Sequence, residues 1–177
     1  MTSKVAEATH EARKTMNEQQ ELLREIEEFA KTAPTATALM EHIVHRLHEK
    51  KTRYNWVGFY LVDRVDPGIL VVGPYAGSFT PNVRIPLDTG LCGAAARTLK
   101  TVVVDDVRND PRYLAGSSMV ISEIVVPVSA NNKLVGELDI ESYFPGTFTR
   151  DEQEFVEACA KVVAAFIAKN GTVRVVS

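Results

Sequence analysis

Cysteine is scarce in this sequence, and long hydrophobic runs are lacking. The 177 residues include two cysteines, Cys92 and Cys159, which are too few for a disulfide framework or a cysteine-rich zinc site. No segment approaches the roughly 18 consecutive apolar residues of a membrane helix, and the first residues lack the apolar stretch of a signal peptide. We therefore expect a cytoplasmic protein that has no membrane partner.

An excess of charge of one sign is lacking too. The chain carries 20 Lys and Arg residues and 23 Asp and Glu residues, for a formal net charge of -3, and the two signs are interspersed. This pattern offers no basic patch to a polyanion, so we expect no nucleic-acid partner. The length and the 45% of hydrophobic residues are typical of one globular domain with a sizeable core.

What the sequence does contain begins with a long amphipathic helix. Apolar residues at helical spacing, with no Pro or Gly among them, predict it from about Ala6 to Ala33. Two interpretations of its apolar side stay open. The helix can pack on the core of its own chain, or it can pair with a second copy and form a homodimer through Met16, Leu23 and Ile26.

A second amphipathic helix is predicted over residues 34–50, with three histidines on its polar side. Because His42, His45 and His48 fan around the solvent side without a nearby fourth ligand, we expect no metal site. The chain is thus expected to consist of an N-terminal helix (1–33), one domain (34–170) and a C-terminal tail (171–177).

After Asn55 the hydrophobic period changes to two, and β-branched and aromatic residues dominate, which predicts strands. The predicted strands lie in the segments NWVGFYLVD, GILVVGPYA, KTVVVDDV, MVISEIVVPVSA and KLVGELDIESY. The pair Asn131-Asn132 predicts a tight turn that joins the last two strands as an antiparallel hairpin. A short helix is predicted near Gly90, and a final helix after Thr149, which with Glu152 matches a capping box.

These elements predict an α+β fold built on a single antiparallel sheet. The terminal helices cover one face of the sheet. The short helix and the loop from Val107 to Met119, here called the lid, are expected to cover the other face. A ligand pocket would then lie beneath this short helix and the lid.

Strand alternation indicates which side chains could reach that pocket. Trp56 and Tyr60 share one face of their strand, and Glu137, Asp139 and Glu141 share one face of theirs. For the second strand, alternation alone favours acidic residues in water and apolar residues in the core.

Glu123 does not fit such a solvent-exposed pattern. The segment MVISEIVVPV surrounds it with apolar neighbours. A half-buried carboxylate is costly unless a cation or hydrogen-bond donors pair with it. A ligand could supply that cation.

Four motifs carry a family resemblance. In their order and spacing, NWVGFYLVD, VRIPLDTGLCGAAA, SEIVVPV and GELDIES resemble the free methionine-R-sulfoxide reductases, a branch of the GAF domain family. The resemblance covers about residue 55 to the final helix. It implies a sheet of six strands and a pocket for a free amino acid such as methionine or its sulfoxide, and we expect no cofactor.

The resemblance also implies roles for the pocket residues. Trp56 and Tyr60 would form an aromatic wall, while Glu123, Asp139 and Glu141 would receive the polar and cationic groups of the ligand. Aromatic faces and clustered carboxylates suit an ammonium group. The family usually has aspartate at the position of Glu141, so the longer side chain could narrow the pocket.

The sequence departs from the family in its cysteines. Members use up to three: one just before RIP, one in the CG of the short helix, and one in the lid about seven residues before the SEIV glutamate. These positions hold Asn82, Cys92 and Gly116 here. In the family the lid cysteine is generally assigned as the attacking thiolate and another as the resolving thiol, so Gly116 stands in the place of the nucleophile.

Cys92 is the remaining candidate for a catalytic residue. The start of a helix lowers the pKa of a thiol, whereas nearby carboxylates raise it, and the sequence does not decide between them. Two functions stay open. One is a small-molecule-binding domain with impaired catalysis, whose N-terminal helix carries a signal or a dimer contact. The other is an active free methionine-R-sulfoxide reductase that uses Cys92 and an external thiol.

We favour the binding domain. Reduction of a sulfoxide needs an activated nucleophile and normally a resolving thiol. Cys159 is expected to be structural, because it lies in the amphipathic final helix.

Overall fold

The structure is a computed structural model that describes residues 2–171, with side chains from residue 13 onward. Its six strands form one antiparallel sheet in the order β3-β2-β1-β6-β5-β4. The strands are β1 (Trp56–Val62), β2 (Ile69–Gly77), β3 (Arg84–Pro86), β4 (Val102–Val104), β5 (Ser122–Ala130) and β6 (Lys133–Ser142). The alternating pattern predicted five of them, and β3, with three residues, is too short to show a period. Beyond Gly171, the predicted C-terminal tail lies outside the described residues.

The hairpin between β5 and β6 is confirmed. Asn131 and Asn132 have φ angles of 53° and 61°, the left-handed region that a two-residue hairpin turn requires and that asparagine tolerates. The hairpin places β6 between β1 and β5, so β6 occupies the middle of the sheet.

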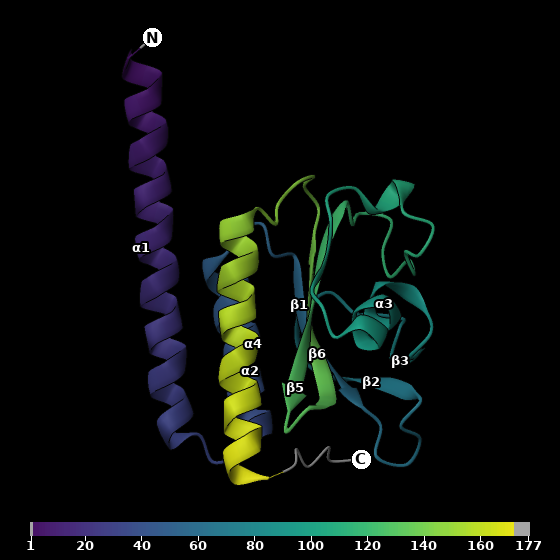
Figure 1. Cartoon of the computed structure of the whole chain (residues 1–177). Coiled ribbons are helices and arrows are strands. Elements are labelled where there is room, and N and C mark those ends of the chain that lie inside the picture. The colour runs from purple at the N-terminus through teal and green to yellow at the C-terminus, as the bar shows by residue number, and fades with distance from the viewer. Residues whose placement is uncertain (1, 172–177) are drawn as a thin grey trace.

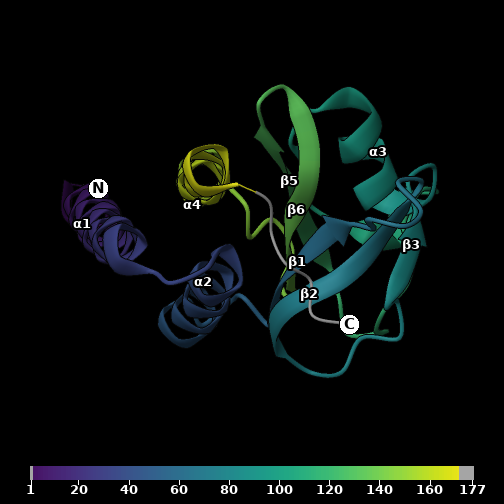
Figure 2. The ribbon, with the colours of Figure 1, turned by 90° about the horizontal axis from the view of Figure 1, so that it is seen from below.

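Helices cover both faces of the sheet. They are α1 (Thr2–Thr32), α2 (Ala36–Lys50), α3 (Gly90–Thr98) and α4 (Arg150–Asn170), with a short 3-10 turn at Val107–Asn109. The helices α2 and α4 lie against one face and α3 lies on the opposite face (Figure 1). Figure 2 shows α1 as an outer layer beyond α2 and α4. The predicted α+β arrangement is therefore confirmed.

No helix within residues 2–171 is both long enough and apolar enough to cross a lipid bilayer. The second helix begins two residues later than predicted, because the Thr35 side chain accepts a hydrogen bond from the backbone N–H of Ala38 and caps it. An N-terminal cap of this kind satisfies one of the free N–H groups of the first turn.

The helix-facing side of the sheet forms the main core. Val57 and Phe59 of β1 and Leu138 and Ile140 of β6 are completely buried there. Burial of each such side chain contributes roughly 1.5 to 3 kcal/mol. Alternate residues of these strands point to the other face, which holds the candidate site.

The second half of α1 packs on this core. Leu22 and Ile26 belong to the buried cluster and Leu23 packs partly against it, whereas Met16 is 49% exposed. The prediction that Ile26 contacts a second copy is wrong, because its own chain buries it completely. Pairing of α1 with a second copy stays a prediction, now restricted to the helix surface around Met16.

A polar contact joins α1 and α4 to the connection between α2 and β1. The Glu152 carboxylate accepts hydrogen bonds from Gln19 (2.9 Å), from Lys51 (2.6 Å) and from the hydroxyl of Tyr54. Thr149 caps α4 as predicted, since its hydroxyl accepts from the backbone N–H of Glu152. The Glu152 side chain does not complete the capping box, because its carboxylate is bound by these other elements.

Candidate functional site

Strand pairing brings the predicted pocket residues to one face of the sheet. Trp56 in β1 lies opposite Glu141 in β6, and Gly58 lies opposite Asp139. Glu123 in β5 also lies opposite Glu141, from the other side. Directly opposed residues of antiparallel strands share a face, so the five residues predicted to bind a ligand all face α3.

This face is covered by apolar side chains from α3 and from the two ends of the lid. Leu91 and Ala95 of α3, together with Val107 and Val120, form a second buried cluster over the sheet, to which Tyr60 also belongs. The helix α3 thus covers this face as α2 and α4 cover the other, and apolar side chains pack on both faces of the sheet.

The acidic residues beneath this cover are buried. Asp139 and Glu123 are 4% and 5% exposed, Glu137 is fully buried, and Glu141 is partly exposed. The expectation from alternation that the acidic face of β6 points to water is wrong, because α3 and the lid cover it.

A small, partly open cavity of about 20 Å³ lies between the sheet and its cover. Tyr60, Glu123, Asp139 and Glu141 line it from the strands and Cys92 lines it from α3. The other lining residues come from the β2–β3 connection, β3, the start of α3 and the lid: Asn82, Ile85, Thr89, Gly90, Leu91 and Leu114. The cavity has room for about one water molecule.

The two aromatic residues take different positions. The hydroxyl of Tyr60 donates a hydrogen bond to the backbone carbonyl of Asn82 at 2.9 Å, and its ring borders the cavity. Trp56 lies behind it, with ring centroids 6.0 Å from Tyr60 and 5.7 Å from Tyr75, and does not line the cavity. A β-carbon on Gly58 would come within 2.2 Å of the Trp56 ring, so glycine is required there.

The carboxylates have no counter-charge in the cavity. Burial raises the pKa of Glu123 and of Asp139 well above the usual range, and repulsion from Glu141 and other neighbouring carboxylates raises both further. Burial also raises the pKa of Glu141 to about 7. Within the described part of the chain, no basic side chain lines the cavity. The cluster is therefore complementary to a cation.

Sequence reasoning left Glu137 out of the candidate site. Both of its carboxylate oxygens, and Oδ1 of Asp139, are buried without a hydrogen-bond partner. Burial raises the pKa of Glu137 to about 8. The sequence did contain a signal for Glu137, because it lies on the same face of its strand as Asp139 and Glu141. The alternation of polar and apolar residues, however, predicted that this whole face is exposed to water.

Cys92 lies in the first turn of α3 as a buried thiol. Burial raises its pKa well above the usual range, and the carboxylates of Asp139, Glu137 and Glu123 raise it further. Its sulfur lies 3.9 Å from Oδ2 of Asp139. The effect of burial and carboxylates therefore exceeds that of the helix start. Cys159 is fully buried in the helix-side core, which agrees with a structural residue.

Asn82 and Gly116, which stand where the family resemblance implies cysteines, are neighbours at the edge of the cavity. A β-carbon on Gly116 would lie 3.5 Å from Nδ2 of Asn82 and 3.4 Å from Oε1 of Glu141. Nδ2 of Asn82 donates a long hydrogen bond of 3.4 Å to the carbonyl of Leu114. The lid thus places Gly116 beside the carboxylate of Glu141.

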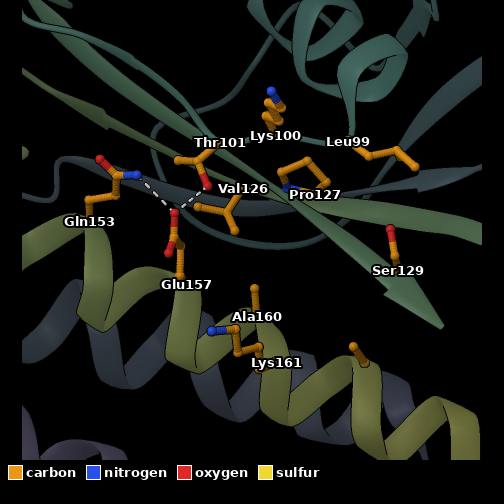
Figure 3. Close-up of a pocket in the computed structure, with 11 residues that line it drawn as sticks. Leu99, Lys100, Thr101, Val126, Pro127, Ser129, Gln153, Glu157, Ala160 and Lys161 are labelled. Atoms are coloured by element: carbon orange, nitrogen blue, oxygen red, sulfur yellow. Dashed lines mark hydrogen bonds between the residues drawn. The ribbon is translucent and has the colours of Figure 1, made fainter. Parts of the chain in front are cut away.

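A larger groove of about 580 Å³ lies elsewhere, between α4, β5 and the connection from α3 to β4 (Figure 3). Its carboxylate, Glu157, accepts hydrogen bonds from Thr101 (2.6 Å) and Gln153 (2.9 Å). Partial burial raises the pKa of Glu157, but these hydrogen bonds outweigh it and hold the pKa below the usual value. The groove is wide and its one carboxylate is already hydrogen-bonded, so we take the smaller acidic cavity as the candidate site.

Known proteins resemble the chain over most of its length. A family model described as "GAF domain" matches residues 35–167. The free methionine-R-sulfoxide reductase of Saccharomyces cerevisiae is 36% identical over 110 residues, which cover 62% of this chain and 61% of the yeast protein. Protein YtsP of Bacillus subtilis is 30% identical over 148 residues, 84% of this chain and 90% of that protein.

Solved structures show the same relationship. Free methionine-R-sulfoxide reductase from Neisseria meningitidis, in complex with its substrate, has a TM-score of 0.80 and 32% identity, covering 85% of this chain and 90% of that one. The type II enzyme from Thermoplasma acidophilum has a TM-score of 0.70 and 31% identity, covering 83% and 98%.

Proposed function

The chain belongs to the GAF domain family and is related to its free methionine-R-sulfoxide reductases, and from this we propose that it binds a free amino acid without reducing it. The ligand is methionine, its sulfoxide or a close analogue, held beneath α3. The observation that carries the proposal is the buried carboxylate cluster, which has no basic side chain among its described lining residues.

The ammonium group of an amino acid supplies the missing positive charge. Glu123, Asp139 and Glu141 converge on one cavity, and each ionised carboxylate accepts hydrogen bonds from an ammonium. Tyr60 borders the same space and offers its ring to the side chain of the ligand. Binding would shift these carboxyl groups toward their ionised forms, since an adjacent cation lowers a carboxyl pKa.

The lid must move to admit such a ligand, because the cavity of about 20 Å³ is far smaller than an amino acid. Moving the tip of the lid breaks one long hydrogen bond, of 3.4 Å between Asn82 and Leu114, while the bond from the backbone N–H of Val107 to Ile121 at its base can stay. Leu114 and Met119 are also more than one third exposed. We expect the lid to pack against the bound ligand and exclude water from it.

The absence of reduction follows from the thiols. Reduction of a sulfoxide consumes two thiols and gives a thioether, a disulfide and water. The first step needs a thiolate, but burial and three carboxylates raise the pKa of Cys92 well above the usual range. Gly116 and Asn82 supply no second thiol.

An active reductase that uses Cys92 with an external thiol is the alternative, and the names of the relatives favour it. A ligand that carries positive charge beside the carboxylates would lower the pKa of Cys92 in the complex. Turnover measurements therefore separate the two functions.

Binding is tested by titrating purified protein with L-methionine and with L-methionine-R-sulfoxide in a calorimeter. We expect binding of at least one of them, and none of N-acetylmethionine, which lacks the ammonium group. Glu123→Gln is expected to weaken binding by roughly 1 to 3 kcal/mol, whereas the exposed control Glu154→Gln leaves it unchanged. Equal affinity in both variants would show that the cluster does not hold the ligand.

Turnover is tested with the sulfoxide and either thioredoxin or a small dithiol, by measuring the methionine formed. We expect no turnover above the rate without protein, and unchanged sulfoxide binding in Cys92→Ser. Dithiol-dependent turnover that disappears in Cys92→Ser would instead establish the reductase.

A further inference from the structure

We propose that the same cluster binds a thiophilic divalent cation, Zn2+ or Cd2+, through Cys92, Glu123 and Asp139. This goes beyond the proposed function, since a metal ion rather than an ammonium group then supplies the positive charge. The expectation of no metal site considered the histidines of α2 and did not consider these residues, which come from three separate elements.

The donor atoms already lie close together. One sulfur or oxygen atom from each of Cys92, Glu123 and Asp139 lies within 4.8 Å of the other two. Metal distances of about 2.3 Å to sulfur and about 2.0 to 2.2 Å to oxygen place tetrahedral donors about 3.4 to 3.6 Å apart. The observed 3.9 Å between Cys92 Sγ and Asp139 Oδ2 needs only a small contraction.

Unpartnered oxygens give a second, independent indication. Asp139 is 4% exposed and lines the cavity, yet its Oδ1 has no hydrogen-bond partner. Glu137 is fully buried and both of its oxygens are unpartnered. Buried polar atoms without partners are costly. Coordination of a metal by Asp139 would remove that cost at its own carboxylate.

The chemistry of the donors selects the metal. A thiolate prefers Zn2+ or Cd2+ to a hard cation. The cavity of about 20 Å³ accepts a dehydrated ion, whereas Mg2+ retains several water molecules. Mg2+ is therefore expected to bind poorly.

Binding of the metal exchanges protons without any redox step. The S–H bond of Cys92 breaks, a sulfur–metal bond forms, and the proton passes to the buffer. Any proton on Glu123 or Asp139 leaves in the same way. Since metal and ammonium would occupy the same oxygens, each excludes the other.

The test uses the full chain, dialysed against a chelator, and titrates it with Cd2+, Zn2+ and Mg2+. We expect Cd2+ and Zn2+ to bind with release of protons, detected as a dependence of the binding heat on the buffer. Cd2+ should also produce the ultraviolet absorption of a cadmium–thiolate bond. Equal weak binding of all three metals, with no thiolate absorption, would overturn the proposal.

Two cysteine variants locate the metal. Cys92→Ser is expected to abolish the cadmium–thiolate absorption and weaken Cd2+ binding at least about tenfold, whereas Cys159→Ala keeps both. Retention of the absorption in Cys92→Ser would place the metal elsewhere. A measurement on the unaltered chain does not depend on whether the variants fold. In that chain, Cd2+ should slow the alkylation of Cys92 and leave the alkylation of Cys159 unchanged.

The experiments can refute the proposed amino-acid binding and the proposed metal site independently of each other. Amino-acid binding is measured with chelator present, so it does not depend on any metal. Loss of metal binding with intact amino-acid binding would refute only the metal site, and the reverse result would refute only the amino-acid site.

Discussion

Glu137 shows what burial costs a single carboxyl group in this fold. It lies in the central strand with both oxygens unpartnered, and burial raises its pKa from 4.5 to about 8. At neutral pH the folded protein therefore keeps this group mostly protonated. In the unfolded chain the same group is ionised, so folding is linked to uptake of a proton.

The sign of the pH dependence follows from this linkage. Between about pH 4.5 and pH 8 the folded state binds more protons at Glu137 than the unfolded state does, so the free energy of unfolding falls as pH rises. Full stability is present below the unfolded pKa and is lost as pH rises through the folded pKa. Glu137→Gln, which cannot ionise, should remove that loss.

In the unaltered protein, ionisation of Glu137 should lower the free energy of unfolding by roughly 2 to 3 kcal/mol between pH 5.5 and pH 8. We expect this part of the decrease to be absent in Glu137→Gln. Urea unfolding of the unliganded protein at both pH values measures it. The exposed control Glu154→Gln should retain the decrease. A Glu137→Gln variant with the same pH dependence as the unaltered protein would mean that Glu137 is ionised in the fold.

At the residue scale, sequence reasoning could identify side chains but not their surroundings. The parity of Trp56 and Tyr60 and the apolar neighbours of Glu123 correctly gathered these residues on one face. The pKa of Cys92 could not be predicted, because its direction depends on distances to carboxylates in another element. Trp56 stands behind Tyr60 because Gly58 leaves room for its ring, a packing detail that alternation does not contain.

At the scale of elements, β6 shows why the alternation of polar and apolar residues gave a wrong prediction of which strand face is exposed. A strand with water on one face and a core on the other alternates in polarity, and β6 alternates in the same way although both of its faces are covered. Two of its acidic residues, Asp139 and Glu141, line the cavity. The pattern is therefore the same for a wet face and for a buried polar site, and only the cover supplied by α3 and the lid distinguishes them.

The lid and the β2–β3 connection give a prediction about the missing cysteines. Because a β-carbon on Gly116 would lie 3.5 Å from Nδ2 of Asn82, the double variant Gly116→Cys/Asn82→Cys should place two thiols within reach of a disulfide. Gly116 has no positive φ angle, so its backbone accepts a side chain. We expect mild oxidation to form this disulfide, measured as the loss of two free thiols.

The double variant should also gain the chemistry that the resemblance implies for a lid cysteine and a resolving partner. We expect dithiol-dependent reduction of free methionine-R-sulfoxide, measured as methionine formed. A matched control, Ser118→Cys/Asn82→Cys, carries the same number of thiols with one at an exposed lid position and should remain inactive. A double variant with neither disulfide nor turnover would show that the lid does not hold residue 116 over the site.

At the scale of the whole molecule, the helices on one face of the sheet were predictable and the outer position of α1 was not. The spacing of apolar residues predicts a helix with one buried side, but it does not identify the surface against which that side packs. In the structure Leu22 and Ile26 pack on the chain's own core, while α1 continues past the end of α4 (Figure 1). The molecule thus consists of a layered domain with a helix that extends beyond it.

The extension of α1 leads to the last prediction, that the protein is a dimer. An isolated helix is only marginally stable in water unless tertiary contacts support it. The 31 residues of α1 span about 46 Å, and Met16, at 49% exposure, is the exposed large apolar side chain on the described part of the helix that precedes the core residues Leu22 and Ile26. A second copy that packs along this part would bury Met16 and stabilise the helix.

Sedimentation at micromolar concentration measures the effect. We expect the full chain to sediment as a dimer and a variant without residues 2–16 as a folded monomer, because the truncation keeps Leu22 and Ile26 in the core. Met16→Lys should weaken the dimer, since it places a charge in the new interface. The neighbouring control Lys14→Ser should not weaken it. If the full chain and the truncated variant were both monomers, α1 would serve only its own domain and the surface around Met16 would have no partner copy.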